Sequence, residues 1–136
     1  SALAAHIGQI IEAFLDLVEQ GRRVENAAYV EPVPAHVRTP ADLAAFLAGI
    51  RHRFDAWWSR SGAAADYSAA ADVYYGAQTR HEFFERSVWH AAQHTRQVQL
   101  VLETLGIAPD GPLEAADLAG LPLPENVWDD KMAFST

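Results

Sequence analysis

Two histidines one helical turn apart are the residues of this sequence whose type and spacing point most directly to chemistry. His90 and His94 lie in the segment WHAAQHTRQ, and on a helix this spacing puts both imidazoles on one face, about 40° apart. A helix offers two nitrogen ligands to one metal ion in this way. In a chain with six histidines the pair alone is a weak signal, since chance produces it too. Its position in the middle of a helical pattern, beside Trp89, Ala91 and Ala92, favours the metal site.

A third ligand has to come from another helix, and His6 is the best candidate. It shares an apolar helix face with Leu3 and Ile10, where a histidine turned toward the core needs a polar partner. A lone histidine on such a face is more often a hydrogen-bonded core residue. Beside a histidine pair, the two alternatives stand about even. We therefore take His6, His90 and His94 as the candidate metal ligands.

The other histidines have different expected roles. His81 lies about 180° around the same helix from the pair, so it cannot join their site. His52 is expected to be a solvated residue or a pocket-rim residue, and His36 lies in a proline-containing loop at the surface. Glu82 and Arg86 are interpreted as an ordinary ion pair on the helix surface.

Composition and charge exclude several classes of function. The formal net charge of −8 gives a surface that repels phosphate backbones and anionic lipid, so we expect neither nucleic acid nor membrane as a partner. The absence of cysteine excludes disulfides, thiolate ligands and a cysteine nucleophile, and it fits the cytoplasm. No apolar stretch approaches the roughly 20 residues that span a bilayer, and the first residues lack the charged region of a signal peptide.

Helical periodicity predicts an all-α fold. Apolar residues recur at steps of three and four over residues 1–20, 39–60 and 79–105, which is typical of helices that bury one face. Thr39 and Thr79 stand where N-terminal caps are needed. The third of these helices carries the HxxxH pair, and the first carries His6.

The connecting segments carry turn signals. Prolines in residues 22–38 predict a loop with a short turn around residues 24–30. The alanine-rich residues 63–71 are compatible with a short helix that breaks at Tyr75 and the following glycine. Residues 106–136 contain four prolines but remain too apolar for a disordered tail, so we expect an extended strap that packs on the bundle.

Three segments resemble the DinB-like superfamily of four-helix-bundle metalloenzymes. They are LAAHIGQIIEAFL, which contains His6, then WHAAQHTRQ, which contains His90, His94 and Gln97, and the tail segment LAGLPLPENVWDD. The signature of the family is a histidine on an early helix and HxxxHxxQ on a late one. Residues 74–113 resemble the C-terminal half of the family, and the match covers nearly the whole chain. The tail is similar to that of DinB-like domains fused to glutaredoxin-like or thioredoxin-like domains.

The resemblance implies a function as well as a metal. It implies a three-histidine site for Zn²⁺ or Ni²⁺ with open positions, and a thiol-dependent S-transferase that activates a low-molecular-weight thiol, or water, toward a small molecule. Candidate residues around the site are Gln97, Trp89, Trp57 and Tyr75. No carboxylate stands out as a general acid or base. The alternative is therefore a non-catalytic metal-binding, ligand-binding or dimerisation module attached to a redox domain.

The expected architecture is a single domain over residues 1–136, all-α and four-helix-bundle-like, with a C-terminal strap. The family places a full helix before the one that bears the first histidine, whereas only five residues precede His6 here. We expect that helix to lie outside this chain, or a homodimer to supply the missing wall. Ser1 leads directly into a helical pattern without a start Met, which is typical of a domain taken from a longer chain.

Overall fold

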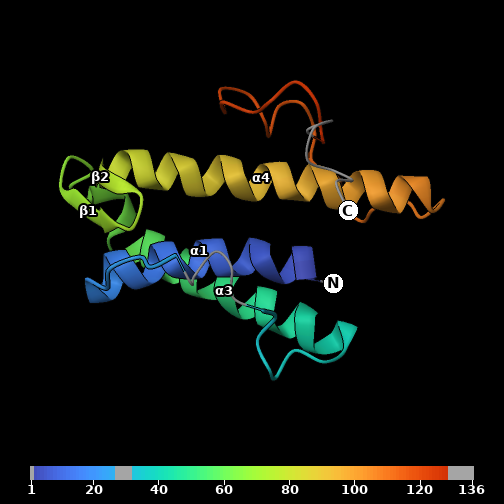
Figure 1. Ribbon diagram of the computed structural model, residues 1–136, viewed down its shortest axis with the longest axis horizontal. Coiled ribbons are helices and arrows are strands. Elements are labelled where there is room, and N and C mark those ends of the chain that lie inside the picture. Colours follow the sequence, from blue (N-terminus) through green and yellow to red (C-terminus); the bar gives the residue numbers. More distant parts are fainter. Residues whose placement is uncertain (1, 27–31, 129–136) are drawn as a thin grey trace.

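The computed structural model describes residues 2–26 and 32–128, which form three long helices, a 3₁₀ turn and a β-hairpin (Figure 1). The elements in chain order are α1 (Ala2–Gln20), α3 (Pro40–Arg60), η1 (Gly62–Ala64), β1 (Ala70–Val73), β2 (Gly76–Thr79) and α4 (Arg80–Thr104). The three helices predicted from periodicity are therefore present, with ends within one residue of their expected positions. None of the described helices is long and apolar enough to cross a bilayer.

Capping boxes determine where α3 and α4 begin. The Thr39 hydroxyl accepts a hydrogen bond from the Asp42 amide, and the Asp42 carboxylate accepts one from the Thr39 amide. Thr79 and Glu82 repeat this exchange at the start of α4. Each box satisfies two backbone N–H groups that the first turn of a helix leaves without partners. The start of α4 sets the helical phase of both of its candidate metal ligands.

The predicted all-α, four-helix-bundle-like fold is wrong. The described residues contain three long helices and a two-stranded antiparallel sheet, so the fold is mixed α and β. The strands pair from Ala70 opposite Thr79 to Val73 opposite Gly76. Val24 adds an isolated parallel bridge to Val73 from the segment that follows α1. The hairpin leads directly into α4 at Thr79.

The short helix predicted over residues 63–71 does not form. Its first residues belong to the 3₁₀ turn η1, and its last two, Ala70 and Ala71, begin the hairpin, which long-range pairing holds in place. The Val24 amide donates to the Asp72 carbonyl, and the Tyr74 amide donates to the Val24 carbonyl, both at 2.9 Å. Val24 and Val73 are 3% and 4% exposed. Alanine favours helices only by a fraction of a kcal/mol per residue, about the size of one net hydrogen bond or less. Burial and pairing with a distant strand therefore override that preference.

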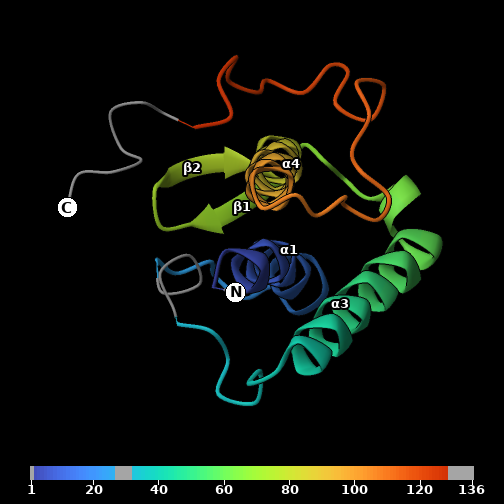
Figure 2. The same ribbon diagram turned by 90° about the vertical axis from the view of Figure 1, so that its right-hand side faces the viewer.

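Helix α1 is the centre of the fold. It packs against α4 on one side and against α3 on another (Figure 2). Phe14 of α1 is fully buried, and its ring contacts those of Trp57 and Phe83 at centroid distances of 5.2 and 5.7 Å. At Gly8 an added Cβ would lie 2.9 Å from side chains of α3 such as Ile50, so glycine permits the close approach of α1 and α3. The aromatic core lies toward the hairpin end of the α1–α4 interface, and the histidines lie toward the N-terminus of α1.

The C-terminal segment runs along the side of α4 that faces away from α1 (Figures 1 and 2). Side-chain amides of Gln93 and Gln97 donate to the Val127 carbonyl at 2.6 and 3.2 Å. Arg96 donates to the carbonyls of Pro124 and Glu125 at 3.0 and 3.3 Å. The described part of the expected strap is thus attached to α4 through its backbone. Part of that strap, residues 129–136, and part of the turn expected at residues 24–30 lie outside the described residues.

Candidate metal centre

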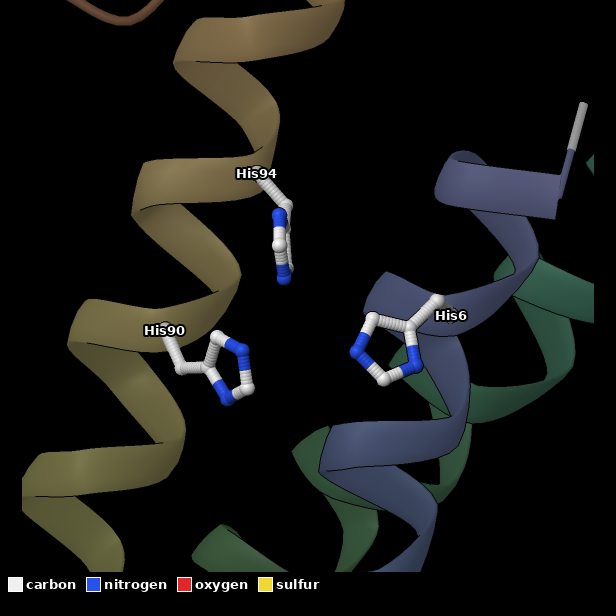
Figure 3. A group of neighbouring side chains, drawn as sticks. All are labelled: His6, His90 and His94. Atoms are coloured by element: carbon white, nitrogen blue, oxygen red, sulfur yellow. The ribbon is translucent and has the colours of Figure 1, made fainter. Parts of the chain in front are cut away.

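Three histidines meet between α1 and α4. His6 projects from α1 toward His90 and His94, which project from successive turns of α4 (Figure 3). Their candidate ligand nitrogens all lie within 4.8 Å of one another. A tetrahedral ion with Zn–N bonds of about 2.0–2.1 Å requires nitrogens roughly 3.3 Å apart. The nitrogens therefore need to approach one another by at most roughly 1.5 Å for all three to reach one ion.

The electrostatics of the site keep the imidazoles of His6 and His90 neutral. Burial, with smaller contributions from the nearby His94, His6 and Arg86, lowers the pKa of His90 from 6.5 to about 4. Burial also lowers the pKa of His6, with a smaller contribution from His94. A ring that is neutral at pH 7 keeps the nitrogen lone pair that a metal ion needs. The donor set therefore fits a divalent cation.

Gln97 orients one of the three rings. His94 Nδ1 and Gln97 Oε1 are 2.7 Å apart, and the other end of the same amide donates to the Val127 carbonyl at 3.2 Å. Because Gln97 Nε2 is a donor to Val127, its Oε1 must accept, so Nδ1 of His94 carries the proton. That tautomer leaves Nε2 of His94 as the ligand atom. The strap thus acts on the site through the Gln97 amide.

A cleft of about 480 Å³ lies next to the histidines, between α4 and the strap. It is lined by Arg86, Trp89, His90, Gln93, His94, Gln97, Pro124, Glu125, Asn126 and Trp128. Two of the three candidate ligands line this cleft, so a small molecule in it would contact them directly. The walls offer two indole rings, three side-chain amides, one cation and one exposed carboxylate.

The sequence-predicted residues around the site fall into two groups. Trp89 and Gln97 line the cleft. Tyr75 lies under the guanidinium of Arg86, 4.6 Å from the ring centroid, and so contacts a residue of the cleft wall. Trp57 is 3% exposed, packs in the aromatic core and is not among the residues that line this cleft.

Arg86 lines the cleft, although the sequence predicted that it would form an ion pair with Glu82 on the helix surface. The predicted ion pair with Glu82 is not formed, because the Glu82 carboxylate is occupied by the capping box with Thr79. Arg86 instead stacks on Tyr75 and lies 5.7 Å from the ring centroid of Trp89. A signal was present in the sequence, since Arg86 precedes His90 by four residues and therefore shares its helix face.

Other residues of the cleft carried less signal. Glu125 reaches the site only because the strap folds back on α4, whereas Gln93 lines the cleft from α4 and donates to the Asn126 carbonyl of the strap. The three remaining histidines, His36, His52 and His81, are exposed, as expected, and none joins the cluster.

No family model, no curated protein and no solved structure matches this chain. The geometry of the histidine cluster and its cleft therefore carries the functional argument.

Proposed function

We propose that His6, His90 and His94 bind one divalent metal ion, as in the DinB-like metalloenzymes. The observation that supports this most is the convergence of three imidazoles from two helices, with ligand nitrogens within 4.8 Å. Neutral imidazole ligands suit Zn²⁺ and Ni²⁺ and leave the ion its full charge. The lowered pKa values of His6 and His90 favour the metal over the competing proton.

The proposed chemistry is that of an S-transferase, in which a low-molecular-weight thiol is the nucleophile that attacks a small-molecule substrate. Water is the alternative nucleophile. A divalent metal at this site supplies Lewis acidity, which lowers the pKa of a thiol or water that it coordinates. Residues of the chain itself orient the metal ligands and admit the substrate. Gln97 holds His94 in one tautomer, and the cleft admits a small-molecule substrate on the side of α4 that the strap borders.

A non-catalytic metal-binding or ligand-binding module is the second candidate. The composition of the cleft favours it, because Glu125 is the one carboxylate among its lining residues and is exposed. A single exposed carboxylate leaves the cleft with little that could act as a general base. Thiol-transfer turnover by metal-loaded protein favours the enzyme, whereas stoichiometric metal binding without turnover on a panel of thiols and electrophiles favours the module.

Metal binding is tested on purified protein by elemental analysis and by titration of metal-free protein with Zn²⁺ and Ni²⁺. We expect one ion per chain, and thermal unfolding should shift upward as metal is added. At a free metal concentration 100 times Kd, the stabilisation is about 2.7 kcal/mol. His94→Ala and His6→Ala should each lower affinity strongly, while the matched variant His52→Ala at an exposed histidine should not.

Circular dichroism of the same variants separates loss of ligand from loss of fold. Helical content should be retained in His94→Ala, because an alanine at this position favours the helix. The proposal is wrong if the purified protein binds no divalent ion, or if the His94 variant is folded and binds metal as tightly as the wild type.

A further inference from the structure

Arg86 is a cation in the cleft wall without an anionic partner in the described part of the chain. Its Nε–H is buried and donates to no described group, and no ion pair joins its guanidinium to a described carboxylate. Most other described arginines are engaged. For example, Arg53 is paired with Asp16 and Glu19 at 2.7 and 2.8 Å. Among the described arginines that lack an ion pair, Arg86 lines the cleft beside the histidines, whereas Arg80 does not.

The guanidinium is held in place by aromatic rings. Its central carbon lies 4.6 Å from the ring centroid of Tyr75 and 5.7 Å from that of Trp89. Such stacking satisfies the faces of the planar group and leaves its N–H edge for hydrogen bonds. Because the side chain is already ordered, an anion that binds to it costs little further conformational entropy.

The position of Arg86 relates it to the histidine cluster. It precedes His90 by four residues on α4, which corresponds to about 6 Å along the helix axis. Both residues line the same cleft. A short molecule can therefore contact Arg86 at one end and the histidine cluster at the other.

We propose that Arg86 binds a carboxylate of the ligand that occupies the cleft, so that the thiol or substrate of this protein is a small carboxylic acid. The inference rests on the proposed function, because that function places a metal ion where the other end of the ligand meets the histidine cluster. A single planar guanidinium matches a planar carboxylate in charge and in hydrogen-bonding geometry.

A phosphate group fits the cleft less well. It carries more charge than one guanidinium offsets, and the exposed Glu125 on the opposite wall would repel the excess. The amide of Gln93 cannot assist, because it donates to the carbonyls of Asn126 and Val127. We therefore assign the anion to the carboxylate class.

Calorimetric titration of the zinc-loaded protein with two thiols of similar size tests the proposal. The wild type should bind 3-mercaptopropionate about tenfold or more tightly than 2-mercaptoethanol, since a hydrogen bond to a charged group has about this effect. Arg86→Gln should lose this discrimination, because the substitution weakens the binding of 3-mercaptopropionate alone. Arg80→Gln is the matched control, because Arg80 is on the same helix and has a buried Nε–H without a described acceptor, but does not line the cleft.

Two further measurements, with succinate and with inorganic phosphate, distinguish failure of this inference from failure of the metal site. In metal-free protein, succinate should shift the Arg86 Nε–H resonance in nuclear magnetic resonance spectra of the wild type. This arm succeeds even if zinc does not bind, in which case only the proposed function fails. The inference is overturned if Arg86→Gln weakens both thiols equally or neither, if succinate leaves the resonance unchanged, or if inorganic phosphate binds at Arg86 more tightly than succinate.

Discussion

Acidification should destabilise the metal-free protein through His90. The ordinary pKa of histidine is 6.5, and burial lowers that of His90 in the folded protein to about 4. Between these two values the unfolded chain binds a proton that the folded chain does not, so the free energy of unfolding decreases as the pH falls. The contribution of His90 is complete above pH 6.5 and is lost as the pH falls through about 4.

The magnitude follows from the pKa difference. One pKa unit corresponds to about 1.4 kcal/mol, so a fall from 6.5 to about 4 sets an upper limit of about 3 kcal/mol. The ring is only partly buried, and solvent screening reduces the effect to about 1–2 kcal/mol. This is a large fraction of the stability of an ordinary domain.

Urea unfolding, monitored by tryptophan fluorescence in the presence of a chelator, measures this effect between about pH 7 and pH 4.5. His90→Gln removes the titrating group, so the stability difference between wild type and variant should change by about 1–2 kcal/mol over this range. Carboxylates with lowered pKa values, such as Asp42 and Glu82, cancel in that difference. Parallel pH profiles for the two proteins would refute the reasoning.

Three other substitutions test the site and the fold. Gln97→Leu should lower zinc affinity by about 10–100-fold in a chelator-competition titration, because it removes the hydrogen bond that orients His94; unchanged affinity would show that Gln97 has no such role. Phe14→Ala should lower the free energy of unfolding by about 3–5 kcal/mol in urea, since its ring is fully buried; a loss below about 1 kcal/mol would contradict the packing described. Thr79→Ala should cost about 1 kcal/mol by the same assay, because the capping box at the start of α4 is lost; equal stability would indicate that the cap is dispensable.

The parts of the structure that the sequence predicted are those governed by neighbouring residues. The bounds of the long helices follow from apolar periodicity and from caps such as Thr39 and Thr79, whose hydrogen bonds span three residues. The same holds for His90 and His94, because one helical turn determines that they share a face. His6 was placed in the cluster from its position on an apolar face, and the structure brings it to 5.1 Å from the His94 ring.

The errors share a physical cause, which is competition from contacts distant in the sequence. Residues 63–71 have helix-forming composition, but they end in strand β1, where pairing with β2 and the bridge from Val24 to the buried Val73 outweigh the small helical preference of alanine. The four-helix-bundle expectation failed at this point, since it left no place for a hairpin. The aromatic stripe that contains Trp57 likewise does not reveal which of its members faces the core, and the structure places Trp57 there.

The His90/His94 pair shows the difference between what the sequence determines and what only the tertiary structure determines. Its spacing alone determined that the two imidazoles project from one side of a helix, because helix geometry is local. Only the tertiary structure decided that His6 of α1 meets them, that Gln97 and Val127 orient His94, and that Arg86 stands in the cleft wall instead of pairing with Glu82. Those relations depend on how α1, α4 and the strap pack, and packing is a sum over contacts that no short stretch of sequence contains.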